Sequence, residues 1–253
     1  MTTASKIIIT ILSIVTVLII FFALIFRGFR SLVFNFSGSY KLVDNCKELD
    51  GVPSEIVFDA SFTDAAIVYG DKFSVEYSMP DALEPTVSFK DGTLTVRTGS
   101  GRTTIPMSVT EDLYIRITIP EGTELENVKV DIDAGNLDIK DLKAGAFILD
   151  MDAGNIDLRN LEADKIQIDC DAGNVDVRGC TADRFVIDLD AGNADITDCE
   201  IDTIDADVDA GNFEARNCTI NDGECNASLG NIYLSGNIGD VKTDADLGNV
   251  EVH

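Results

Sequence analysis

Residues 132–177 read IDAGNLDIKDLKAGAFILDMDAGNIDLRNLEADKIQIDCDAGNVDV, in which the tetrapeptide Asp-Ala-Gly-Asn returns at a constant interval. Five copies lie 19 residues apart, and they begin at Asp133, Asp152, Asp171, Asp190 and Asp209. Two degenerate copies follow, beginning at Ser228 after 19 residues and at Asp246 after 18. A fixed period of this length over seven copies indicates a solenoid, in which each repeat is one structural unit stacked on the next.

Within each repeat, apolar residues alternate with polar residues, which is the period of a β-strand and does not fit a helix. In the third copy Ile166, Ile168 and Cys170 alternate with Gln167 and Asp169. One such coil cannot bury its apolar face alone, but coils stacked ~4.8 Å apart form a continuous core. We therefore expect Asp169 and its equivalent Asp188 to be exposed. The residues expected in the core are Ile168, Ile187, Val208, Val175 and Ile196.

The Gly-Asn pairs of the tetrapeptides predict sharp turns, because glycine adopts positive φ without strain. The asparagine can cap the turn or join its equivalents in an inward amide ladder. These turn residues are Gly135, Asn136, Gly154, Asn155, Gly173, Asn174, Gly192, Asn193, Gly211 and Asn212.

Residues 7–26 read IIITILSIVTVLIIFFALIF and carry no charge. A helix of this length, at ~1.5 Å per residue, spans a hydrocarbon core of ~30 Å. No small-residue cleavage pattern follows, so we predict a retained signal anchor in place of a cleaved signal peptide. Lys6 precedes the segment and Arg27 and Arg30 follow it, so charge does not decide its orientation. We expect the C-terminal domain to lie outside the cell, as is usual for an export-compatible β-domain after such an anchor.

The predicted fold is all-β, a single-stranded β-solenoid of stacked 19-residue coils preceded by one N-terminal transmembrane helix. Strand-like runs separated by Gly, Pro and Asp indicate that the first coils are irregular. The expected divisions are an N-terminal tail (1–6), the anchor (7–26), a juxtamembrane connector (27–53), irregular opening coils (54–127) and the regular solenoid (128–253).

The stretch TIPEGTELENVKVDIDAGNLDI (118–139), followed by repeated Ala-Gly-Asn turns, resembles the toast-rack, or adhesin-like, family of bacterial β-solenoid domains. The upstream stretches FTDAAIVYGDKFSVEYS and VSFKDGTLTVRT are similar to the less regular first coils of that family. The resemblance covers residues 54–253 and implies a surface-exposed domain joined to a membrane segment, associated with adhesion or envelope-stress sensing. It carries over no site residues, because the family has no agreed biochemical activity.

The amino-acid composition disfavours several classes of function. Lys and Arg total 19 against 45 for Asp and Glu, a net charge of -26, which disfavours nucleic acid as a partner. The only histidine is His253, so a histidine base, a catalytic triad and a multi-histidine metal site are all disfavoured. We therefore expect no enzymatic activity and no cofactor other than weakly bound calcium.

Three cysteines, Cys180, Cys199 and Cys218, share one column of the predicted stack. Neighbours in a column lie close enough for a disulfide. The favoured alternative is that each is a small buried hydrophobe filling a narrow corner. Cys170 and Cys225 also fall at inward positions, which supports that alternative.

Acidic residues recur in columns expected to face outward. Carboxylates ~5 Å apart repel by ~1 kcal/mol even in water, so such a column needs compensation. Oxygen ligands of this kind predict weak calcium sites, while diffuse screening by salt is the favoured alternative. The candidate metal column is Asp131, Asp150, Asp169, Asp188 and Asp207. A second acidic column is Asp138, Asp157, Asp176, Asp195 and Glu214.

The predicted function is a membrane-anchored, non-catalytic interaction module at the cell surface, either an adhesin or an envelope-associated sensory or scaffold domain. The alternative is a carbohydrate-active enzyme that uses surface Asp pairs on a β-helix scaffold. Every coil repeats the acids and the chain has no Trp to stack on sugars, which disfavours the enzyme. Expected partners are the lipid bilayer through residues 7–26, an unknown envelope or protein partner, and weak end-to-end self-association through Leu247, Val250 and Val252.

Overall fold

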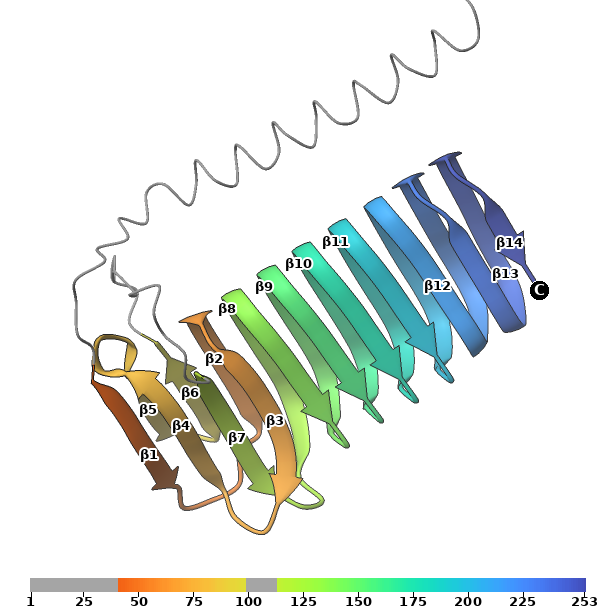
Figure 1. Cartoon of the computed structure of the whole chain (residues 1–253). Coiled ribbons are helices and arrows are strands. Elements are labelled where there is room, and N and C mark those ends of the chain that lie inside the picture. Colours follow the sequence, from red (N-terminus) through yellow and green to blue (C-terminus); the bar gives the residue numbers. More distant parts are fainter. Residues whose placement is uncertain (1–40, 99–112) are drawn as a thin grey trace, which may run out of the picture. The chain divides into compact units, whose positions relative to one another are not determined.

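The computed structural model of the chain describes residues 41–98 and 113–253 (Figure 1). They form one sheet of 14 strands that is wound into a β-solenoid. The only helical element among them is a short 3-10 turn, η1 (Asp81–Leu83). No helix of the described residues is long and apolar enough to cross a membrane, and the anchor expected at residues 7–26 lies outside them.

The regular part of the solenoid confirms the predicted stack of 19-residue coils. Successive coils pair in parallel without a register shift, so that Ile168 lies opposite Ile187 and Ile187 opposite Ala206. A shift appears only between Ala215 and Cys218, where the spacing shortens to the 18 residues of the last repeat. The strands of this part are β8 (Glu124–Lys140), β9 (Lys143–Arg159), β10 (Glu162–Arg178), β11 (Thr181–Thr197), β12 (Glu200–Leu229), β13 (Ile232–Leu247) and β14 (Val250–Val252).

The Asp-Ala-Gly-Asn segment is a bend inside a long strand and not the predicted sharp turn, but the expected positive φ is found at Gly135, Gly154, Gly192 and Gly211, with values from 142° to 157°. Backbone pairing runs straight through it, since Gly173 pairs with Gly154 and Gly192 on its two sides. Glycine is required by the close approach of the coils: a Cβ on Gly173 would lie 1.5 Å from the carbonyl oxygen of Gly154. The tight corners lie instead between the long strands, where Asn160 has φ of 53° and Asp198 has φ of 56°.

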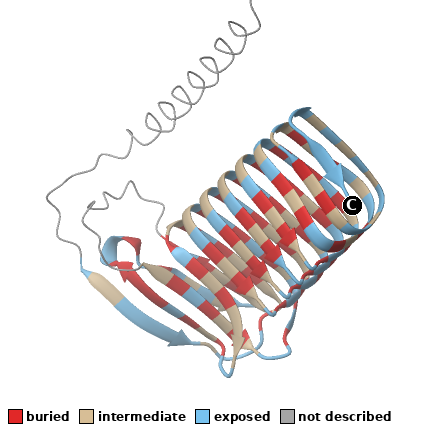
Figure 2. Ribbon diagram, turned by 45° about the vertical axis from the view of Figure 1, so that its right-hand side comes forward, coloured by how far each residue is buried: buried red, intermediate tan, exposed pale blue. Residues whose placement is uncertain are grey.

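The core consists of inward columns that run along the stack, as the alternating red and blue segments of Figure 2 show. The buried positions predicted from the alternation are confirmed, because Ile168, Ile187, Val208, Val175 and Ile196 are each at most 1% exposed. Asp169 and Asp188 lie on the outside, as expected. The alternation therefore assigned the two faces of the coils correctly.

The opening coils differ from the rest because antiparallel strands extend the sheet at this end. β2 and β3 form one complete coil that pairs with β8, and β6 and β7 continue the stack in parallel. β1, β4 and β5 then pair antiparallel. The strands are β1 (Leu42–Glu48), β2 (Glu55–Phe62), β3 (Asp64–Gly70), β4 (Ser74–Pro80), β5 (Thr86–Lys90), β6 (Thr93–Arg97) and β7 (Tyr114–Pro120).

Strand β1 lies inside residues 27–53, the range expected to be a connector. It pairs with β4 along its whole length, from Leu42 opposite Pro80 to Glu48 opposite Ser74. The folded unit therefore begins before Ser54.

Candidate functional site

The column of the predicted calcium ligands lies on the outer surface of the regular coils. Register places Asp131 opposite Asp150 and Asp169 opposite Asp188, so the carboxylates inside the column have like charges above and below them. The pKa of Asp150 is raised above its usual value, first by partial burial and then by Asp169 and Asp131. Partial burial and neighbouring carboxylates raise the pKa of Asp188 and Asp131 in the same way.

The geometry of this column does not form a discrete metal centre. In the part of the chain that the structure describes, no group of three or more His, Cys, Asp or Glu side chains is arranged to hold a metal ion. Each coil offers one carboxylate of the column, so a cation would have to be shared between successive coils. Calcium binding here stays a prediction.

The second acidic column is half-buried, and among the described residues all its members except Asp138 are paired with arginines, which the sequence interpretation missed. Asp157 accepts a hydrogen bond from Arg159, and Asp176 accepts one from Arg178. Further along, Arg216 pairs with Glu214 and also reaches Asp195 at 3.2 Å. Residues two apart on a strand share a face, so the spacing Asp-x-Arg was the signal that could have predicted these pairs.

The second carboxylate oxygen of three of these side chains makes no hydrogen bond with the described residues. Oδ1 of Asp138, of Asp157 and of Asp176 is buried and has no hydrogen-bond partner among the described residues.

The asparagines of the repeat form an amide ladder on the outside of the solenoid, which corrects the predicted inward position. Asn155 Nδ2 donates to Asn136 Oδ1 over 2.9 Å, and the pattern continues to Asn249, which donates to Asn231 over 3.1 Å. At its other end, the backbone N and Nδ2 of Asn136 both donate to Asp64 Oδ1. The bend at glycine changes the phase of the alternation, so the asparagine points outward and the next residue points in.

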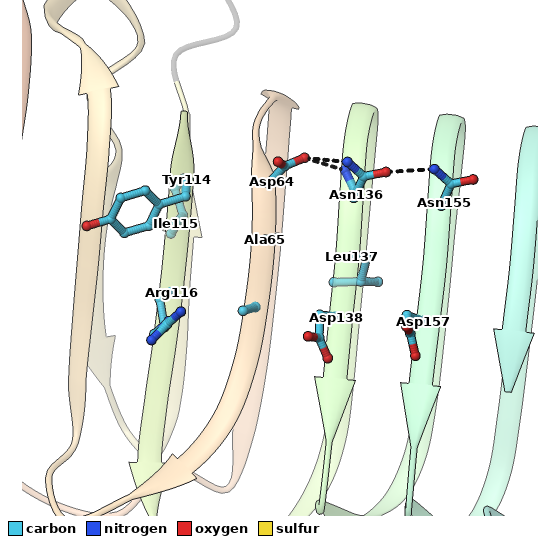
Figure 3. Close-up of a pocket in the computed structure, with 11 residues that line it drawn as sticks. Asp64, Ala65, Tyr114, Ile115, Arg116, Asn136, Leu137, Asp138, Asn155 and Asp157 are labelled. Atoms are coloured by element: carbon cyan, nitrogen blue, oxygen red, sulfur yellow. Dashed lines mark hydrogen bonds between the residues drawn. The ribbon is translucent and has the colours of Figure 1, made fainter. Parts of the chain in front are cut away.

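A groove lies where the amide ladder and the second acidic column begin (Figure 3). Its volume is about 380 Å³. Ala66 of β3 lies between Arg116 of β7 and Asp138 of β8 in register. Later coils carry Asp157 and its equivalents at this position, so the small side chain leaves a depression that we call the Ala66 groove. It is lined by Asp64, Ala65, Ala66, Tyr114, Ile115, Arg116, Asn136, Leu137, Asp138, Asn155 and Asp157.

Comparison with known proteins assigns the chain to a family. The model of the Toastrack DUF4097 family matches residues 54–250. The chain belongs to this family. A comparison with curated proteins finds no match.

Solved structures similar to this toast-rack chain share its fold at low sequence identity. A "putative lipid binding protein" from Parabacteroides distasonis is 18% identical, with a TM-score of 0.51 over 83% of this chain and 96% of its own. A "putative adhesin" from Parabacteroides merdae is 15% identical, with a TM-score of 0.50 over 85% of this chain and 98% of its own. At these identities the likeness supports the fold alone.

The cysteine column packs in a corner of the toast-rack core. Cys180, Cys199 and Cys218 are free thiols and at most 2% exposed, as expected for small buried hydrophobes. The Cys199 Sγ accepts a hydrogen bond from the Cys180 backbone N over 3.4 Å. Contact with the Cys180 thiol is the main cause that raises the pKa of Cys199 to about 12. The thiolate form of Cys199 is therefore suppressed at neutral pH, which makes this cysteine a poor nucleophile.

Proposed function

We propose that this toast-rack protein is a membrane-anchored, non-catalytic interaction module whose solenoid surface binds an envelope component outside the cell. The observation that carries the proposal is the repetition of charged outward columns in constant register, from Asp131 to Asp207 and from Asp138 to Glu214. Such a surface offers many equivalent contacts along one axis. Membership of the Toastrack family and structural relatives described as adhesin or lipid-binding proteins support a binding role.

The anchor and the orientation are part of the same proposal. Residues 7–26 are long and apolar enough to hold the domain at a bilayer, with the C-terminal domain outside. Protease added to intact cells should then remove the solenoid. If the solenoid is digested only after lysis, the orientation is wrong.

Alternative catalytic use of the acids has less support. A glycosidase needs one specialised pair of carboxylates. Here the second column repeats in coil after coil, and Asp157 and Asp176 are paired with Arg159 and Arg178.

The binding role can be tested by crosslinking in intact cells that express the full chain, followed by affinity purification. The test variant replaces Asp150, Asp169 and Asp188 with Asn. A control variant replaces three exposed acids of the opening coils with Asn, so that the net charge changes equally; these are Asp71, Asp81 and Asp91.

We expect a partner that crosslinks to the wild type and to the control but is lost from the test variant. If the partner is lost equally from both variants, net charge accounts for the binding and the position of the column does not. If no specific partner crosslinks to the wild-type chain, the proposal is contradicted.

A further inference from the structure

We propose that the Ala66 groove binds a small zwitterion, such as a dipeptide with free ends, with its carboxylate on Arg116 and its ammonium on Asp138. This inference does not depend on the binding role of the acidic columns, because the groove lies at the start of the regular coils and contains both signs of charge.

The two charges of the groove differ from the charged residues of the next coils in having no ion-pair partner among the described residues. In the next two coils Asp157 and Asp176 are paired with Arg159 and Arg178. Among residues 41–98 and 113–253, neither Asp138 nor Arg116 has an opposite charge within the 4.0 Å of an ion pair. Oδ1 of Asp138 is buried without a hydrogen-bond partner in this part of the chain, as it is in Asp157 and Asp176. The ligand would therefore contact the other carboxylate oxygen, Oδ2, which Arg159 and Arg178 contact in the next two coils.

A space lies between the two charges. Arg116 and Asp138 lie in register on either side of Ala66, two strand spacings apart, which is ~9.6 Å between their backbones. The methyl group of Ala66 does not fill this gap, and the groove has a volume of about 380 Å³. That volume lies within the range of small-ligand sites. Figure 3 shows the Arg116 and Asp138 side chains on opposite sides of β3, with no labelled side chain bridging the gap.

The other polar groups of the groove already have partners. Asp64 accepts two hydrogen bonds from Asn136, and Asn136 Oδ1 accepts one from Asn155. Glu76 of β4 lies opposite Arg116 in register, but its carboxylate accepts the hydroxyl of Tyr114 over 3.1 Å. The Tyr114 ring points away from the groove (Figure 3). The two unpaired charges therefore determine what the groove binds.

A ligand with both charges satisfies both groups at once. The planar guanidinium of Arg116 can bind a carboxylate through two parallel hydrogen bonds. An ammonium group can donate to the carboxylate of Asp138. A ligand with only one of the charges would leave the other protein group without a partner.

The test measures binding of alanyl-alanine to the full chain in detergent by calorimetry or by NMR. N-acetylalanine has only the carboxylate and alanine amide has only the ammonium, so they serve as single-charge probes. We expect saturable binding of the dipeptide, and at least about tenfold weaker binding of either single-charge probe.

Variants assign the binding to the groove. Arg116→Gln and Asp138→Asn should each weaken dipeptide binding at least about tenfold, and Ala66→Asp should abolish it by filling the groove and pairing with Arg116. The matched control is Arg178→Gln, which removes an arginine from a regular coil away from the groove and should leave binding unchanged. Circular dichroism of each variant checks that it folds.

Three results would overturn the proposal: no saturable binding of the dipeptide up to about 10 mM, equal binding of the single-charge probes, or equal effects of Arg116→Gln and Arg178→Gln. Each of these outcomes leaves the crosslinking test of the acidic columns unaffected. The two proposals can therefore fail separately.

Discussion

Replacing Gly173 with alanine should unfold the middle of the solenoid, because the added methyl group has no space. Its Cβ would lie 1.5 Å from the carbonyl oxygen of Gly154 and 2.7 Å from the carbonyl carbon. A normal carbon-to-oxygen contact is at least ~3.3 Å, so the two coils would have to separate by nearly ~2 Å at this point. A backbone hydrogen bond of ~2.9 Å does not survive such a displacement.

The magnitude follows from the bonds that are lost. Gly173 lies within a continuous parallel ladder, with Ala172 opposite Ala153 and Asn174 opposite Asn155. Breaking roughly three of these backbone bonds, at about 1 to 2 kcal/mol each when their groups stay buried, gives a loss of about 3 to 6 kcal/mol. That is a large share of the ~5 to 15 kcal/mol that stabilises a typical domain.

Gly122→Ala is the matched control. Nothing lies within 4 Å of a Cβ at Gly122, although its φ of 76° still disfavours alanine. This control should cost only about 1 to 2 kcal/mol. Thermal and urea unfolding of both variants, followed by circular dichroism, would decide the matter. The reasoning fails if Gly173→Ala is no less stable than Gly122→Ala.

Four further predictions follow from the faces of the coils. Ile187→Asp should destabilise the fold by several kcal/mol in urea unfolding, because it buries an unpaired charge. The outward substitution Asp188→Asn should not destabilise it. Equal losses of stability in the two variants would show that the register is wrong. The pKa values of Asp131, Asp150 and Asp188 are raised in the folded state. Just above the usual aspartate pKa, the folded state therefore binds more protons than the unfolded state. The contribution of these three residues to stability should then rise as pH falls from 7 toward about 4. The Asp150→Asn, Asp188→Asn double variant should melt higher than the wild type at pH 7 and show a smaller pH dependence, and an unchanged pH dependence would contradict this cause. Discrete calcium sites should raise the melting temperature at micromolar to low millimolar calcium in ~0.15 M monovalent salt. The double variant Asp169→Asn, Asp188→Asn should abolish this rise. If the melting temperature follows only ionic strength, diffuse screening by salt explains the effect and discrete sites are excluded. Exposed Leu247, Val250 and Val252 should support weak end-to-end association, which sedimentation at high concentration would reveal and a strictly monomeric chain would exclude.

The repeat predicted the stack and its core because each position recurs in the same environment. Ile168 and Ile187 had to be buried together, since a constant 19-residue period and a two-residue alternation leave no other arrangement of the apolar face. The position of the asparagines was less predictable. The bend at Gly173 changes the phase of the alternation, and its geometry depends on how closely Gly154 approaches in the coil below.

The Ala66 groove depends on contacts between strands far apart in the sequence. It exists because Ala66 pairs with both Arg116 and Asp138, and irregular segments without a repeat separate these strands. No spacing rule gives that register. The pairing of β1 with β4 was missed for the same reason, since Leu42–Glu48 carries no copy of the motif.

The outer amide ladder has a direction. Every side-chain amide donates toward the preceding coil, from Asn249 through Asn231 and Asn212 down to Asn136. The amide dipoles therefore point the same way and add along the axis, as peptide dipoles do in a helix. The positive end of this row meets the carboxylate of Asp64, which accepts its last hydrogen bond over 2.8 Å. Asp64 thus acts on a column of side chains as an acidic cap acts on the first turn of a helix, and hydrogen bonds that polarise one another link its charge to amides several coils away.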